Sequence, residues 1–113
     1  MAKQLKQKQL KESEIQMVIC DYLALKKLFF WRQNTTPIWD GKNGLFRAMP
    51  KYSMRGVADI ILIGKGGFVV FIEVKRKGGK LSEYQEAFKK ECEKIGAVYL
   101  VATSLDDVIN YGL

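Results

Sequence analysis

Three ionisable residues in the middle of the chain could act together in catalysis: Asp59, Glu73 and Lys75. Asp59 is the only charged residue of the stretch 57–63, and Glu73 interrupts the apolar run FVVFIEV at 68–74. Alternate residues of a strand point to the same face, so Glu73 and Lys75 share one face. Because burying a charge without a partner is costly, Glu73 needs a specific partner. This partner is either a cation of the protein, from Lys75 or from a neighbouring helix, or a bound metal ion.

The turn that follows residue 63 decides whether Asp59 and Glu73 meet. Two runs rich in β-branched residues flank the stretch GKGG at 64–67, a pattern typical of a β-hairpin. A loop with an odd number of residues, such as Lys65-Gly66-Gly67, places Asp59 opposite Glu73, with β-carbons roughly 5 Å apart. A loop with an even number places the two carboxylates on opposite faces of the hairpin.

Two carboxylates at that separation predict a bound cation. Each carboxylate raises the pKa of the other in a poorly hydrated site unless a positive ion lies between them. The chain has no histidine, and oxygen ligands alone favour a hard ion, Mg²⁺ or Mn²⁺. Such an ion polarises a phosphate and helps to ionise a water, while Lys75 stabilises the developing charge or orients the attacking water.

The elements that must position these residues follow from hydrophobic periodicity. Ile15, Ile19, Tyr22 and Leu23 have helical spacing and predict a helix over 14–27, with Ser13 at the start of a capping-box pattern. Strands are predicted over 28–33, 57–63, 68–75 and 97–103, and a short last helix after Ser104 carries Leu105, Val108 and Ile109.

A second capping-box pattern, Ser82-Glu83-Tyr84-Gln85, begins another predicted helix. Its core stripe is Tyr84, Phe88, Cys92 and Ile95, and Gly96 ends it. The order is α-β-β-β-α-β-α, which predicts an α/β fold with a mixed sheet flanked by helices. The β-α-β unit over 68–102 predicts a parallel strand pair.

The stretch from Asn34 to Arg55 is predicted to be irregular, since it contains Pro37, Gly41, Gly44 and Pro50. A loop of this length in a small domain indicates either a functional segment or an additional element that periodicity does not reveal.

Length and charge indicate one basic domain. A chain of 113 residues has room for a single core, and we expect one domain over 1–113, with 1–11 as a basic arm or helix extension. The net charge is +7, and the cations cluster at 3–11, 42–55 and 75–80. Such clustering favours nucleic acid over a membrane as partner.

Composition excludes several classes of site. Without histidine, Ser-His and Cys-His catalysis and histidine metal clusters are excluded. Cys20 and Cys92 lie among apolar residues of helical patterns and are predicted to be small core residues in a reducing compartment. The sequence has neither a membrane-span pattern nor an apolar segment near its N-terminus, so we expect a cytoplasmic protein, in a bacterial host cell if it is phage-encoded.

The ordered set of motifs resembles the PD-(D/E)XK nuclease superfamily, and more closely its VRR-NUC branch. The resemblance runs through WRQN (31–34), RGVADIIL (55–62), FIEVKRKGGKLSEYQ (71–85) and GAVYLVATSLDDV (96–108). It implies a restriction-endonuclease-like fold and metal-dependent hydrolysis of DNA phosphodiester bonds. Ala58 stands where the namesake proline of the superfamily often precedes the aspartate.

The resemblance also implies roles for individual residues. Asp59 and Glu73 would be metal ligands together with the Val74 carbonyl, and Lys75 the catalytic lysine. Glu14 would complete the acidic site from the first helix, and Gln85 would support the site or the scissile phosphate. Both of the last two have an alternative explanation as helix-capping residues, Glu14 in the first helical turn and Gln85 in its capping box.

Stand-alone members of this size resemble Holliday junction resolvases of phages and bacteria. A four-way junction has two-fold symmetry, so a resolvase is expected to be a homodimer with two active sites. The predicted contacts to the DNA backbone are Arg47, Lys51, Arg55, Lys77 and Lys80. The aromatic residues of the 39–52 loop could insert at a junction, or pack in the core or across the dimer.

Two other functions remain open from sequence. The same chemistry could act on flaps, ends or single strands, and a non-catalytic nucleic-acid-binding module could keep the fold and the charge.

Overall fold

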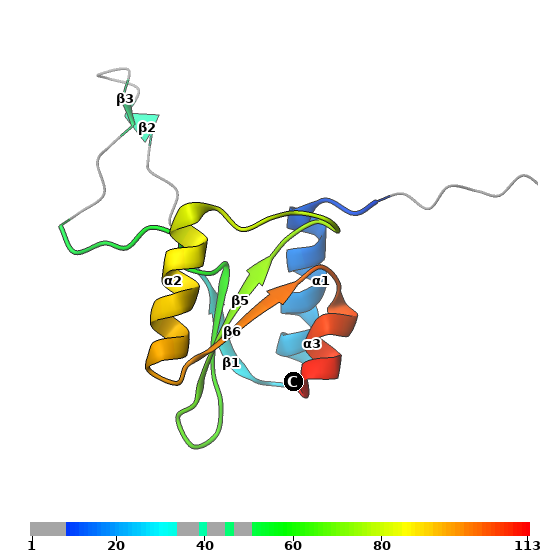
Figure 1. The fold of residues 1–113 in the computed structure, drawn as a ribbon. Helices are drawn as coiled ribbons and strands as arrows, with labels where there is room; N and C mark the ends of the chain where they lie inside the picture. Colours follow the sequence, from blue (N-terminus) through cyan, green and yellow to red (C-terminus); the bar gives the residue numbers. More distant parts are fainter. Residues whose placement is uncertain (1–8, 34–38, 41–44, 47–50) are drawn as a thin grey trace, which may run out of the picture.

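The structure is a computed structural model that describes residues 9–33, 39–40, 45–46 and 51–113, with residues 39–40 and 45–46 described by their backbone alone. Its elements are α1 (Glu12–Leu25), β1 (Phe29–Arg32), β2 (Trp39–Asp40), β3 (Leu45–Phe46), β4 (Ile60–Ile63), β5 (Val69–Val74), α2 (Glu83–Lys94), β6 (Val98–Ala102) and α3 (Leu105–Tyr111). Four strands form one sheet in the order β1-β4-β5-β6. Figure 1 shows α2 on one face of this sheet, and α1 and α3 on the other.

The sheet is mixed, as predicted. β4 pairs antiparallel with both β1 and β5, whereas β5 and β6 are parallel. The connection between the two parallel strands contains α2, which gives the β-α-β unit predicted for residues 68–102. The α/β fold class and the order of its main elements are confirmed.

The 34–55 stretch contains an additional ladder that periodicity did not predict. β2 and β3 pair antiparallel, with Trp39 opposite Phe46 and Asp40 opposite Leu45, in a sheet separate from the main one. Strands of two residues are too short to show an alternating pattern, so hydrophobic periodicity cannot predict them.

The main core lies between the sheet and the pair α1 and α3. Alternate residues of the two central strands, Ile60 and Leu62 of β4 and Val70 and Ile72 of β5, are fully buried there. The remaining buried members of this cluster are Ile15, Ile19, Cys20, Leu23, Val74, Ala102 and Val108. Burial of alternate β5 residues on this face leaves Phe71 and Glu73 on the opposite face, which α2 covers.

Both ends of the first helix differ from the prediction of 14–27, since α1 runs from Glu12 to Leu25. It begins at Glu12 because the Glu14 carboxylate accepts a hydrogen bond from the Lys11 backbone N–H at 3.2 Å and so caps an earlier start. Lys11, not Ser13, is the N-cap residue.

α2 buries only part of its predicted stripe. Phe88 and Cys92 are buried, but Tyr84 is 55% exposed and Ile95 80% exposed. Ile95 lies beyond the last helical residue, and Gly96, with a φ of +85°, ends the helix there.

Cys20 and Cys92 are both buried and free, as predicted, and burial raises the pKa of each thiol. Among the helices of the described residues, none has the length and apolar character needed to cross a bilayer.

Candidate active site

The hairpin turn places Asp59 opposite Glu73. The ladder pairs Ile63 with Val69 and Ile60 with Ile72, and one further step along this register pairs residue 59 with residue 73. The Gly64 N–H donates to the Phe68 carbonyl at 2.8 Å, so three residues form the loop. Of the two alternatives that the sequence left open, the structure has the odd loop, and both carboxylates start from the same face of the hairpin.

Glu73 is a buried carboxylate with unequal surroundings for its two oxygens. Glu73 as a whole is 3% exposed. Oε1 accepts a hydrogen bond from Gln85 Nε2 at 2.8 Å and lies 3.9 Å from Lys75 Nζ, while the buried Oε2 has no hydrogen-bond partner among the described residues. Burial, and then the neighbouring charge of Asp59, raises the pKa of Glu73 to about 8. Without a cation, the site therefore favours a protonated Glu73 at neutral pH.

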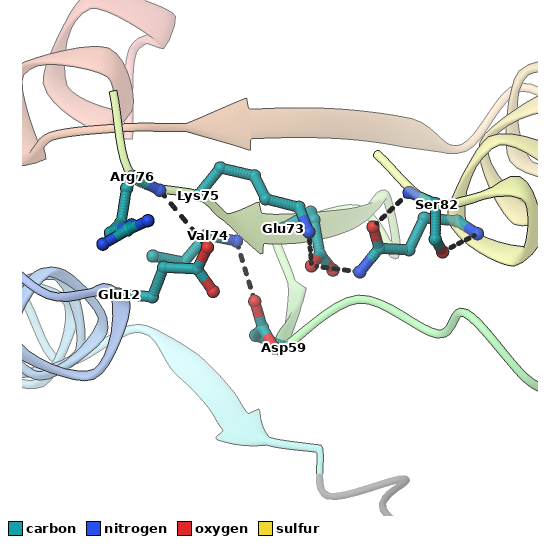
Figure 2. Close-up of polar contacts among 8 residues, drawn as sticks. Glu12, Asp59, Glu73, Val74, Lys75, Arg76 and Ser82 are labelled. Atoms are coloured by element: carbon teal, nitrogen blue, oxygen red, sulfur yellow. Dashed lines mark hydrogen bonds and ion pairs between the residues drawn. The ribbon is translucent and has the colours of Figure 1, made fainter. Parts of the chain in front are cut away.

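Asp59 is held against the end of β5 by the backbone. Its Oδ2 accepts a hydrogen bond from the Val74 N–H at 2.8 Å. Burial raises the pKa of Asp59 above its usual range, and this hydrogen bond opposes the increase. Figure 2 shows Asp59 below the strand and Lys75 extending along it to Glu73.

Gln85 caps α2, as one of its two sequence-based explanations predicted, and it also contacts Glu73. Its Oε1 accepts the Ser82 N–H at 2.8 Å, and the Ser82 hydroxyl accepts the Gln85 N–H at 3.2 Å, which completes the capping box of α2. Its Nε2 donates to Glu73 at the same time. The N-terminus of α2 and the orientation of the Glu73 carboxylate are therefore linked through one side chain.

The first helix brings Glu12 to the site, whereas the Glu14 carboxylate is engaged in capping. Glu12 Oε1 accepts a hydrogen bond from the Arg76 N–H at 3.4 Å, and its charge is among the causes that raise the pKa values of Asp59 and Glu73. Residues two apart on a helix do not face the same way, since each residue turns it by about 100°. Sequence reasoning missed Glu12 because it started this helix two residues too late.

The donor set fits a weakly held divalent ion. In the described part of the chain, no group of three or more Asp, Glu, Cys or His side chains is arranged to hold a metal. Mg²⁺ does not need such a cage, because it binds through one or two carboxylates, several waters and substrate phosphates. The unpartnered, buried Glu73 Oε2 beside Asp59 is a suitable first ligand. A ligand role for the Val74 carbonyl stays a prediction.

Gly56 allows the segment before Asp59 to pack on the first turn of α2. Its φ is +81°, and a β-carbon at this position would collide with the Tyr84 carbonyl group and lie 2.8 Å from the Gln85 nitrogen. Only glycine satisfies both the backbone conformation and the close approach.

Gly56→Ala should therefore destabilise the protein by about 2 kcal/mol, since it adds a backbone collision to the cost of a positive φ. Urea unfolding measures this. Gly66→Ala is the matched control, because Gly66 also has a positive φ, +88°, but no atom lies within 4 Å of the added carbon. Equal losses for the two variants would contradict the packing argument.

The predicted DNA contacts that the structure describes are Lys51, Arg55, Lys77 and Lys80, and all four are exposed; Arg47 lies outside the described residues. The connection that carries residues 77 and 80 crosses the end of the sheet between α1 and α2 (Figure 1). Arg55 donates to the Tyr84 hydroxyl at 3.1 Å, and its guanidinium lies 5.2 Å from the centre of the Tyr84 ring.

Tyr84 is thus a second residue that sequence reasoning misplaced. Its helical spacing suggested a core position, yet it is exposed beside Arg55 and precedes Gln85. Its place in the first helical turn was the available signal, because that turn projects beyond the sheet.

Comparison with known proteins supports the fold. Neither a protein-family model nor a curated protein matches the chain. A solved structure described as "VRR_NUC domain protein" is similar over 92% of this chain and 86% of its own, with a TM-score of 0.69 and 21% sequence identity. The resemblance indicated by the sequence motifs is therefore confirmed in the fold.

Proposed function

We propose that this protein is a metal-dependent nuclease that hydrolyses DNA phosphodiester bonds, with Asp59, Glu73 and Lys75 at its active site. The observation that carries the proposal is the buried Glu73 carboxylate, which lies opposite Asp59 and has one oxygen without a protein partner. In such a site the carboxylate stays ionised at neutral pH only when a cation binds it. A nuclease-like fold supports the proposal, as do the exposed Arg55 beside the first turn of α2 and the exposed lysines of the connection between β5 and α2.

Mg²⁺ or Mn²⁺ bound by Asp59 and Glu73 would polarise the scissile phosphate and lower the pKa of a bound water. Gln85 fixes Glu73 Oε1, and the Val74 N–H fixes Asp59 Oδ2, so each carboxylate keeps its orientation. The Lys75 side chain is 13% exposed and reaches Glu73, a position from which its ammonium group stabilises negative charge on the phosphate or orients the attacking water.

The acidic group from the first helix is assigned to Glu12. Its contact with the Arg76 N–H and its charge at Asp59 and Glu73 support this assignment. Glu14, which the family resemblance suggested, is engaged by the Lys11 N–H. A cleavage assay of the variants Glu12→Gln and Glu14→Gln tests this assignment, which expects loss of activity with Glu12→Gln. Loss of activity with Glu14→Gln and not with Glu12→Gln would reverse it.

The proposed substrate is branched DNA, with a four-way junction first. Exposed lysines and arginines suit phosphates rather than base edges, so recognition of shape is favoured over recognition of sequence. Two cuts at symmetry-related places require two active sites, and hence a homodimer. The edge strand β1 carries Phe29, 66% exposed, and Trp31, 38% exposed, which offer an apolar surface to a second copy.

The test is cleavage of a labelled four-way junction, a 5′ flap and a linear duplex of matched sequence, each with Mg²⁺, Mn²⁺ or EDTA. Paired cuts in the junction with metal alone support a resolvase. Preference for the flap, or a monomer in sedimentation, moves the proposal to a flap- or end-specific nuclease. Binding without cleavage of any substrate leaves the non-catalytic binding module and contradicts the nuclease.

Arg55 should contribute mainly to DNA affinity. Arg55→Ala is expected to weaken binding by about three- to tenfold and to reduce the slope of log K against log salt by about one, as the loss of one phosphate contact predicts. Fluorescence anisotropy at several salt concentrations measures both. Lys65→Ala, in the exposed hairpin turn, is the control; an equal effect there would show that only net charge matters.

A further inference from the structure

Two buried polar atoms of the described side chains have no hydrogen-bond partner: Glu73 Oε2 and the Tyr99 hydroxyl. The large majority of buried polar side-chain atoms in proteins have a partner, and an unpaired one typically costs about 1 to 3 kcal/mol. Where two such atoms belong to neighbouring residues, one bridging ligand can satisfy both.

The sheet places these two residues side by side. β5 and β6 are parallel, with Phe71 opposite Tyr99 and Glu73 opposite Val101. Residues directly opposite each other share a face, so Tyr99 is the diagonal neighbour of Glu73 on the face covered by α2.

Aromatic packing fixes the Tyr99 ring in this position. The Phe88 ring of α2 meets Phe71 edge-on at 4.9 Å and lies 6.0 Å from the Tyr99 ring. Burial raises the pKa of Tyr99, and the next causes are the charges of Glu73 and Asp59, in agreement with a hydroxyl directed toward the two carboxylates.

We infer that one buried water joins the Tyr99 hydroxyl to Glu73 Oε2, and that Tyr99 is a positioning residue for this carboxylate. When Glu73 is ionised, the hydroxyl donates to the water and the water donates to Oε2, which keeps a second lone pair for a cation. When Glu73 is protonated, the same water accepts from Oε2 and from the hydroxyl. With Gln85 on Oε1 and the water on Oε2, both oxygens of Glu73 are fixed from two different elements, α2 and β6.

A double-mutant cycle of unfolding measured in EDTA tests the coupling between Tyr99 and Glu73, and it does not require that the protein cleave DNA. Tyr99→Phe should raise the equilibrium constant for unfolding about fivefold when Glu73 is present, and less than about twofold in a Glu73→Ala background. Tyr111→Phe, which removes the same atom from an exposed residue of α3, is the control. A neutral or stabilising Tyr99→Phe would overturn the inference, because removal of an idle buried hydroxyl gives that result.

A crystal structure and kinetics complete the test. We expect an ordered water within hydrogen-bond distance of both atoms, and its absence overturns the inference. The kinetic consequence rests on the proposed function: Tyr99→Phe should lower kcat several-fold and leave the Kd for DNA unchanged. If the wild type does not cleave DNA, the proposed function fails, while the cycle and the crystal structure still decide the role of Tyr99.

Discussion

Glu73→Ala should lower the rate of metal-dependent junction cleavage by about a thousandfold, the size of effect expected when a preorganised group that stabilises transition-state charge is removed. The substitution deletes the buried Oε2 and the acceptor of the Gln85 hydrogen bond together. Glu73→Gln keeps the shape and removes the charge, and it should be almost as inactive. Single-turnover cleavage with Mn²⁺ measures both rates.

The control for this experiment is Glu91→Ala. Glu91 is a 64% exposed carboxylate that pairs with Lys94 near the other end of α2, so its loss should leave cleavage unchanged. If Glu73→Ala cleaves at the wild-type rate, the proposed nuclease site is wrong.

Without divalent metal, the protein should become less stable as the pH rises from about 5 to about 9, by about 3 kcal/mol in the free energy of unfolding. The pKa of Glu73 is about 8 in the fold against an ordinary value of 4.5. The folded state therefore keeps a proton that the unfolded chain has already lost. The stabilisation is complete below the unfolded pKa and is lost as the pH rises through the folded one. Thermal melts in EDTA at several pH values measure this.

Glu73→Gln is the control for the pH effect, since it cannot ionise and should flatten the dependence. Mn²⁺ should restore the stability of the wild type at high pH and have little effect at low pH, because the ion and the proton compete for the same carboxylates. A wild-type protein whose stability is independent of pH in this range would contradict the burial of an ionisable Glu73.

The geometry of the hairpin that carries Asp59 and Glu73 is local, so the sequence limited it to two alternatives, an odd or an even turn. The position of Asp59 relative to Glu73 depends on strand alternation and on the number of residues in one glycine turn, and both are visible in the chain. The fold class followed in the same way, from the order of periodic segments and from family motifs.

The other residues around Glu73 could not be predicted, because their positions depend on contacts between elements that are distant in the sequence. Whether Glu12 or Glu14 meets the site is decided by which carboxylate is taken by the Lys11 N–H, a choice that moves the start of the helix by two residues. The proximity of Tyr99 to Glu73 follows only from the pairing of β5 with β6. No periodic pattern encodes either relation.

The closed turn of the hairpin also limits where this gene can change in length. Gly64 and Phe68 close the turn, so residues inserted at Lys65-Gly66-Gly67 would lengthen the loop and leave the pairing of Asp59 with Glu73 intact. A residue inserted within β4 or β5 would instead shift the register by one and turn the buried side chains beyond it to the wrong face of the sheet. Relatives that keep this chemistry should therefore vary in length between residues 64 and 68, and an alignment of their hairpins would show no gaps within the two strands.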